Sequence, residues 1–227
     1  MWMPLMSQSV MNRAVLLLGT YAIAMALLEA AVVVYMRRLY YPANPLELFP
    51  LHFLEVYDPL LEFSREVATI VMILSVALLA ERRSLTRCFA AFVFVFGLWD
   101  LFYYIWLKIL IDWPRQWLEW DVLFLIPAVW LGPWICPVAI AILLITWGSW
   151  ALLSHREATF TTSSSAIFVS GAGLGVVTFM QPAVAHGAET LSSLEPGPFG
   201  WRLFLTSYLL MATGLALTVW PCSEVKR

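Results

Sequence analysis

The sequence predicts an all-α, polytopic bundle of transmembrane helices, and two observations lead to this fold class. Of the 227 residues, 62% are hydrophobic and only 12% are charged, with a mean hydropathy of +0.82, whereas soluble domains carry about 25% charged residues. The hydrophobic residues also form runs of about 20, the length that crosses a bilayer as a helix. No run of soluble character interrupts this pattern, so we expect a single membrane domain over residues 1–227.

Six hydrophobic runs are long enough to form spans. The first exceeds the 7–15 residues of a signal-peptide core, and no convincing cleavage site follows it, so we expect a retained span. The second begins at Asp58-Pro59, a good N-cap followed by a proline at the first helical position. The fifth carries Gly171 and Gly175 four residues apart, a pattern that lets two helices approach closely. The expected spans are residues 14–36, 59–80, 87–109, 133–153, 163–182 and 201–220.

The section 111–132 is apolar, but it contains acidic residues and is broken by Pro114 and Pro127. We therefore expect a short interfacial or re-entrant segment around 113–131, with a seventh span as the alternative. Aromatic residues crowd this segment and the end of the third span. They are typical of an interfacial belt, and the alternative is an aromatic wall around a lipid-like ligand. These residues are Trp99, Tyr103, Tyr104, Trp106, Trp113, Trp117, Trp120 and Trp130.

Basic residues near the span ends predict the orientation, because cytoplasmic loops carry an excess of Lys and Arg. With both termini in the cytoplasm, seven basic residues lie inside and five outside, which favours this orientation in a bacterial inner membrane. Acidic residues of the outer loops, Asp121 among them, would then lie outside. The inner residues would be Arg13, Arg82, Arg83, Arg87, Arg156, Lys226 and Arg227, and the outer ones Arg37, Arg38, Lys108, Arg115 and Arg202.

Ionisable residues also lie within the first three spans, at similar depth. At 1.5 Å per residue, Glu66 and Glu29 lie about 10 Å from the outer ends of their helices, and Asp100 lies about 12 Å deep. Glu62 and Glu66 are i,i+4 neighbours, and Arg65 is three residues from Glu62. We expect Glu62, Arg65, Glu66 and Asp100 to form one buried cluster in which Arg65 contacts at least one acid.

Three further residues complete the candidate binding site. Glu29 shares the depth of the cluster, although depth does not determine which face of its helix it occupies. Tyr103 and Tyr104 follow Asp100 by three and four residues, so they flank it on the same helix.

A charged side chain in the membrane costs about 2.5–3.5 kcal/mol, so these residues need partners. Three interpretations are open for the cluster. The first is a structural network that holds the first three spans together. The second is a site for a proton, a cation, an amine or a polar lipid headgroup. The third is a set of side chains that extend separately to the interface.

Metal binding is a weak alternative at the same place. His52 and Glu55 are three residues apart, and Glu62 and Glu66 follow them, a pattern related to the carboxylate and histidine ligands of helix-bundle metal sites. The Glu-x-x-His motif of those sites is missing from the sequence, so we expect neither a metal nor another cofactor. The three cysteines show no metal-ligand spacing, and without a basic stripe we expect no nucleic-acid partner.

For function, the sequence contains no recognisable nucleophile or cofactor motif. We therefore expect a transporter-like protein, a ligand-binding protein or a subunit of a membrane complex, with the lipid bilayer as its surroundings. The alternative is a membrane-embedded enzyme that acts on a lipid or isoprenoid. A deep, apolar lateral cleft ending at Glu62 and Glu66 would favour that enzyme, and a closed, fully paired cluster would favour a structural role.

Three stretches, REVATIVMILSVALLAERR, LWDLFYYIWLKILIDWP and WDVLFLIPAVWLGP, together resemble an uncharacterised family of bacterial polytopic integral membrane proteins. The resemblance covers about residues 10–155. It implies the class and the bacterial source, and it implies no activity and no catalytic residue.

Overall fold

A computed structural model describes residues 8–46, 48–49, 58–82, 84–185 and 197–219 of the chain. In this described part, six helices are long and apolar enough to cross a membrane, so the predicted all-α bundle of six spans is confirmed. The helices are α1 (Gln8–Tyr40), α2 (Asp58–Ala80), α3 (Leu85–Ile111), α4 (Ile135–Leu153), α5 (Thr162–Ala185) and α6 (Trp201–Val219).

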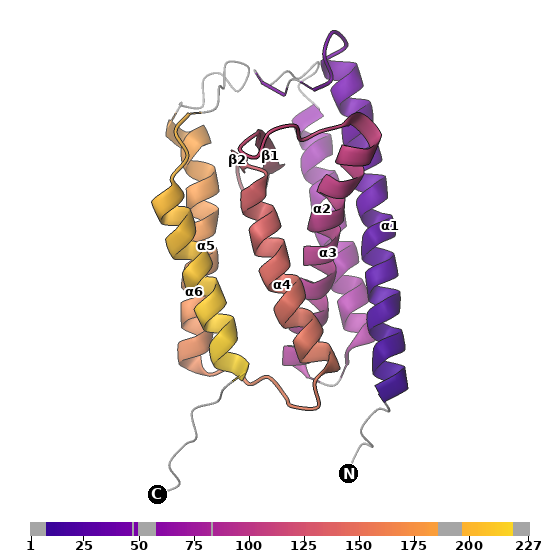
Figure 1. The fold of residues 1–227 in the computed structure, drawn as a ribbon, viewed down its shortest axis with the longest axis vertical. Helices are drawn as coiled ribbons and strands as arrows, with labels where there is room; N and C mark the ends of the chain where they lie inside the picture. The colour runs from indigo at the N-terminus through magenta and orange to yellow at the C-terminus, as the bar shows by residue number, and fades with distance from the viewer. Residues whose placement is uncertain (1–7, 47, 50–57, 83, 186–196, 220–227) are drawn as a thin grey trace, which may run out of the picture.

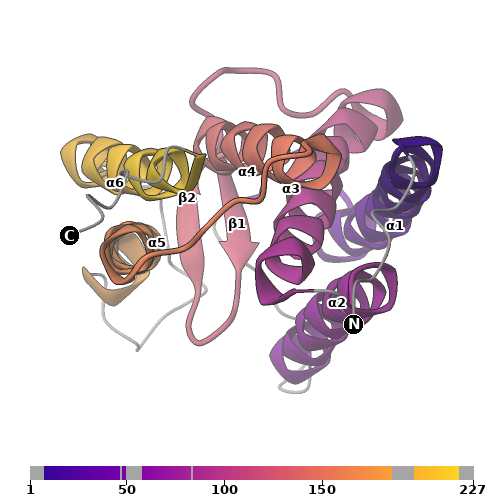
Figure 2. The ribbon, with the colours of Figure 1, turned by 90° about the horizontal axis from the view of Figure 1, so that it is seen from below.

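The helices run side by side along the long axis of the molecule (Figure 1). Viewed along that axis, α1, α2 and α3 lie on one side, the pair α5 and α6 lies on the other, and α4 lies between them (Figure 2). The helix α3 packs against α1, α2 and α4, while α5 packs against α6. The connection between the two sides includes a hydrogen bond of 2.9 Å from the Trp147 indole N–H to the Thr218 hydroxyl.

The glycines of α5 explain its close contact with α6. A Cβ atom on Gly171 would lie 2.7 Å from the backbone nitrogen of Met211, and one on Gly175 would lie 2.8 Å from the Ser207 hydroxyl oxygen. Ser207 in turn donates a hydrogen bond of 2.8 Å to the Gly171 carbonyl. The close approach predicted from the spacing of these two glycines is therefore confirmed.

The section between α3 and α4 forms a β-hairpin, and the described chain contains no seventh spanning helix. Strand β1 (Trp120–Phe124) pairs antiparallel with β2 (Trp130–Pro133), and the register is irregular between Val122 and Phe124. The apolar composition suggested an interfacial or re-entrant segment but not strands. Pairing satisfies the backbone N–H and C=O groups that an irregular apolar segment would leave without partners. The hairpin lies near one end of the bundle, between the two groups of helices (Figures 1 and 2).

At the opposite end of the bundle, Arg87 joins three helices. Its Nε and Nη2 groups donate hydrogen bonds of 3.1 and 2.9 Å to the carboxylate of Glu81, which directly follows α2. Its Nη1 and Nη2 groups also donate to the carbonyls of Ala151 and Leu152, at 3.3 and 3.1 Å. Carbonyls in the last turn of a helix lack intrahelical partners, so Arg87 on α3 satisfies the end of α4 while it pairs with Glu81.

Candidate functional site

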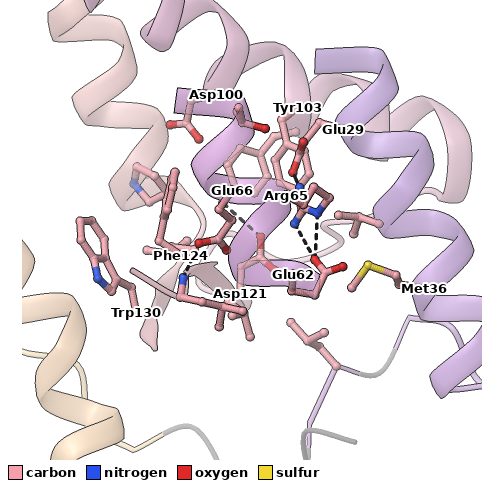
Figure 3. Close-up of a pocket in the computed structure, with 18 of the residues that line it drawn as sticks. Glu29, Met36, Glu62, Arg65, Glu66, Asp100, Tyr103, Asp121, Phe124 and Trp130 are labelled. Carbon is pink, nitrogen blue, oxygen red and sulfur yellow. Dashed lines mark hydrogen bonds and ion pairs between the residues drawn. The ribbon is translucent and has the colours of Figure 1, made fainter. Parts of the chain in front are cut away.

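All seven residues predicted for the binding site line one cavity of about 220 Å³. The cavity lies between the first three helices, the hairpin, α4 and α5, and Figure 3 shows many of its side chains. Its polar side chains come mainly from α1, α2 and α3. Its remaining wall is apolar and largely aromatic, with contributions from β1, α4 and α5. The predicted residues that line it are Glu29, Glu62, Arg65, Glu66, Asp100, Tyr103 and Tyr104.

Arg65 is the centre of the first group of polar residues. Its Nε and Nη2 atoms lie 2.9 and 2.8 Å from Glu62 Oε2, and its Nη1 atom forms an ion pair with Glu29 on α1 (Figure 3). The contact with Glu62 follows from the i,i+3 spacing on α2. The contact with Glu29 shows that this acid lies on the face of α1 that meets α2. Arg65 thus links the two helices through a pair of carboxylates.

Glu66 makes a different contact. Its Oε2 atom accepts a hydrogen bond of 2.8 Å from the backbone N–H of Leu125, the residue after β1. Leu125 lies beyond the paired part of the hairpin, so its N–H needs a partner outside the sheet. Among the described residues, Glu66 forms no ion pair with Arg65, and it attaches the hairpin to α2 instead.

Asp100 is the third part of the predicted cluster. It lies on α3 and lines the cavity, where it is half-buried. Its carboxylate forms no hydrogen bond or ion pair with any residue that the structure describes. The predicted single cluster is therefore divided into the Arg65 group, the Glu66–Leu125 contact and an unpaired Asp100, all facing the same space.

The sequence did not predict a further ion pair at this cavity, which is separate from those of Arg65. Arg37 Nη2 lies 3.3 Å from Asp121 Oδ1, and only 3% of each side chain is exposed. The Tyr104 hydroxyl donates a hydrogen bond of 3.2 Å to Asp121 Oδ2, and the Arg37 guanidinium lies 4.0 Å from the centre of the Trp113 ring. Burial raises the pKa of Asp121 to about 6, although Arg37 and the Tyr104 hydrogen bond oppose this shift.

The sequence did not predict that Arg37 and Asp121 would meet at the cavity, and the length of α1 is one reason. The predicted span ended at residue 36, whereas the helix continues to Tyr40, so Arg37 lies on a helix face and not in a loop. The other reason is the hairpin, which brings Asp121 back against the bundle. The sequence offered one sign of this contact, because Asp121 is the lone acid in the apolar stretch WDVLFL and would need a partner if that stretch were buried.

Aromatic side chains form a continuous wall of the cavity. Phe96, Trp99, Phe124, Trp130 and Phe179 follow one another with ring-centre distances of 5.6, 6.2, 5.6 and 6.2 Å. Such distances are typical of favourable aromatic pairs. The alternative of an aromatic wall thus describes Trp99 and Trp130 better than an interfacial belt does.

Tyr103 and Tyr104 line the cavity as well, whereas the rest of the predicted aromatic belt does not: Trp106, Trp113, Trp117 and Trp120. Trp117 is 74% exposed, as an interfacial side chain would be. Trp106 donates a hydrogen bond of 3.1 Å from its indole N–H to the Ile23 carbonyl on α1, so it joins α3 to α1.

Two of the four residues of the weaker metal-site hypothesis, His52 and Glu55, lie outside the described residues. Within the described residues, no group of three or more His, Cys, Asp or Glu side chains could hold a metal ion. The arrangement that is present can bind a polar group at its ionisable side chains and an apolar group along its aromatic wall.

Comparisons with models of protein families, with curated proteins and with solved structures gave no match. The chemistry of the cavity is therefore the basis for proposing a function.

Proposed function

We propose that this multi-pass membrane protein binds an amphipathic molecule, with the polar head of the ligand in the cavity and its apolar part along the aromatic wall. The proposal rests on one observation, which is that a single cavity combines an apolar, aromatic wall with ionisable side chains from three helices. Ligand sites typically have this composition, with mostly apolar linings and a few convergent polar groups.

The architecture around the cavity supports entry from the bilayer. The helix α2 packs against α3 and α1, whereas α5 packs against α6 and β2. Thr69 of α2 and Phe179 of α5 both line the cavity, so it lies at the boundary between two groups of helices. We place the protein in the inner membrane of a bacterium with both termini in the cytoplasm, as the basic residues favour.

A variant that fills the cavity tests ligand binding. Ile140 on α4 lines the cavity, and Ile140→Trp should lower the amount of amphiphile that co-purifies with the full chain, measured by mass spectrometry of extracted lipids. Ile142 on the same helix is 50% exposed, so Ile142→Trp is the matched control. Equal amounts of bound amphiphile in both variants and in the unmodified protein would contradict the proposal.

The orientation can be tested by labelling single cysteines in a variant whose three natural cysteines are replaced. Ser84 and Gln116 are both exposed, and they lie at opposite ends of α3. With cytoplasmic termini, a cysteine at Gln116 should react with an impermeant reagent added to intact cells, and one at Ser84 should not. The reverse labelling pattern would overturn the orientation.

A second candidate function is a membrane-embedded enzyme that modifies a lipid or isoprenoid. One observation favours it, namely that the cavity reaches Glu62 and Glu66 and also contains the unpaired carboxyl group of Asp100. An acid in such a place could transfer a proton to a bound substrate. In that case, Asp100→Asn should keep the bound amphiphile but stop its chemical conversion, followed by mass over time in proteoliposomes. A transporter-like or subunit role would leave the amphiphile chemically unchanged.

A further inference from the structure

The cavity contains more negative than positive groups. Among the described residues that line it, the acids are Glu29, Glu62, Glu66, Asp100 and Asp121, and the bases are Arg37 and Arg65. Five carboxylates against two guanidinium groups leave an excess of three acids. Charge of one sign is costly in an apolar environment unless protons or a cation balance it. Asp100 is the acid without a hydrogen bond or an ion pair in the described structure, so it is the natural partner for a cationic ligand group.

The same cavity also contains buried donors without acceptors. The indole N–H of Trp99, a residue that is 6% exposed, has no hydrogen-bond partner among the described residues, nor do the Nε and Nη1 groups of Arg37, which is 2% exposed. Both residues line the cavity. Buried donors are normally satisfied, so these groups indicate a ligand that carries an oxygen acceptor.

Because these groups line one cavity, they favour a ligand that carries both a cationic group and an acceptor oxygen. We propose that the cavity binds the head of a zwitterionic aminophospholipid, with its primary ammonium at Asp100 and its phosphate oxygens at Arg37 and the Trp99 N–H. This inference rests on the proposed function, because it names the amphiphile that the cavity takes.

The aromatic wall supports the ammonium assignment. Ammonium groups are attracted to the faces of aromatic rings, most strongly to Trp. Tyr103 and Trp130 line the same space as Asp100 (Figure 3), and so does Trp99. A primary ammonium also has three N–H donors for carboxylates, which a trimethylated ammonium lacks. An anionic phospholipid without an amine would add negative charge to a cavity that already has an excess.

The size of the cavity supports a head group as its occupant. Pockets that enclose whole drug-sized ligands measure about 300–1,000 Å³, and this cavity measures about 220 Å³. A small polar head fits such a volume, the start of its acyl chains lies along the aromatic wall, and the rest of the chains remains in the bilayer. The ligand is thus a membrane lipid and not a free head group.

Lipid exchange into the purified full-length protein tests the assignment. The protein is placed in bilayers that contain equal amounts of phosphatidylethanolamine, phosphatidylglycerol and phosphatidylcholine, and bound lipids are counted by native mass spectrometry. Since hydrogen bonds to charged groups are strong, we expect phosphatidylethanolamine to be preferred by about tenfold or more over either other lipid. Equal retention of all three lipids, or a preference for phosphatidylglycerol or phosphatidylcholine, would overturn the proposal.

Two variants test which side chains recognise the head group of the phospholipid. Asp100→Asn should remove the preference for the primary amine, and Trp99→Phe, which keeps the ring but lacks the N–H, should weaken it. Asp112→Asn is the control, because Asp112 lies outside the cavity with 68% of its side chain exposed. An unchanged preference in Asp100→Asn would contradict the proposal.

Two further measurements separate this inference from the proposed function. If Ile140→Trp removes bound lipid but no head group is preferred, the cavity binds amphiphiles and the aminophospholipid assignment is wrong. If Ile140→Trp has no effect, the proposed function itself is wrong. Glycerophosphoethanolamine, which has no acyl chains, should compete poorly with the lipid, and equally strong competition would contradict a lipid as the ligand.

Discussion

The carboxylate of Glu66, on a membrane-spanning helix, accepts a hydrogen bond of 2.8 Å from the backbone N–H of Leu125, which lies just beyond the paired strands of the hairpin. The two residues are 59 positions apart in the sequence, and the whole of α3 lies between them. Together with the contacts of Asp121 with Arg37 and Tyr104 and the packing of β2 against α5, this contact holds against the bundle a two-stranded hairpin, an element that is marginally stable by itself in water. It also gives the carboxylate of Glu66 a structural partner at the cavity.

We predict that Glu66→Leu destabilises the protein and that Glu66→Gln does so much less. Leucine would leave the half-buried Leu125 N–H without an acceptor, at a cost of about 1–3 kcal/mol, whereas the glutamine amide oxygen can still accept the hydrogen bond. The measurement is the free energy of unfolding in detergent micelles. Asp112→Asn, at an exposed position, is the control. Equal stabilities for Glu66→Leu and Glu66→Gln would show that the contact contributes nothing.

A second prediction concerns Arg65 and its two carboxylates. Arg65→Ala should cost about 3 kcal/mol of unfolding free energy, because it leaves Glu29 and Glu62 partly buried without their cation. Adding Glu29→Gln and Glu62→Gln to this variant should recover part of the loss, because no charge is then stranded.

The folding yield in membranes and the unfolding free energy of the single and combined variants measure this coupling. Arg38→Ala, at an exposed position of α1, is the control. Simple additivity of the three substitutions would mean that the residues do not act as a group.

The six spans were predictable because each is a long apolar run, and a helix is the simplest element that satisfies its own backbone in lipid. The depth of Glu29, Glu66 and Asp100 likewise placed them at one level, which is where the cavity lies. Depth and spacing did not reveal their partners. The ion pair of Arg65 with Glu29 depends on how α1 is rotated against α2, and periodicity in a helix that is apolar on most faces carries little information about rotation.

The hairpin was the main feature that the sequence did not predict, and its absence from the prediction explains the missed residues. Strands of four and five residues in a Trp-rich segment resemble an interfacial loop in composition. Without the hairpin, Asp121 had no reason to be near Arg37, and Leu125 had no reason to contact Glu66. Contacts of the hairpin with helices distant in the sequence, rather than local propensity, therefore determine this part of the cavity.

A third prediction concerns Arg87 at the other end of the bundle. Arg87→Met should lower the unfolding free energy by about 3 kcal/mol, because it leaves the buried carboxylate of Glu81 without its cation and the last carbonyls of α4 without donors. Glu81→Gln added to Arg87→Met should restore part of this loss.

Thermal and denaturant unfolding in micelles measure the effect. Arg156→Met, at an exposed position, should change the unfolding free energy by less than about 0.5 kcal/mol. If Arg87→Met proved as mild as Arg156→Met, the network around Arg87 would have no role in stability.

The last prediction is a pH dependence that originates at Asp121. In the folded protein its pKa is raised to about 6 from an ordinary value of 3.8, mainly by burial, while Arg37 and the Tyr104 hydroxyl favour the ionised form and Glu119 opposes it. The folded protein therefore binds a proton here in a range of pH where the unfolded chain has released it. The contribution of Asp121 to folding stability should be highest below about pH 4, fall as the pH rises towards 6, and stay lower above that, by about 3 kcal/mol.

Asp121→Asn cannot titrate, so its unfolding free energy should lack this step, whereas Asp112→Asn should keep it. The measurement is the difference in unfolding free energy between the unmodified protein and Asp121→Asn from about pH 4 to about pH 7, which cancels the titration of other groups. If that difference changed with pH in the opposite direction, the ion pair with Arg37 would outweigh burial, and the Asp121 carboxylate would stabilise the fold in its charged form.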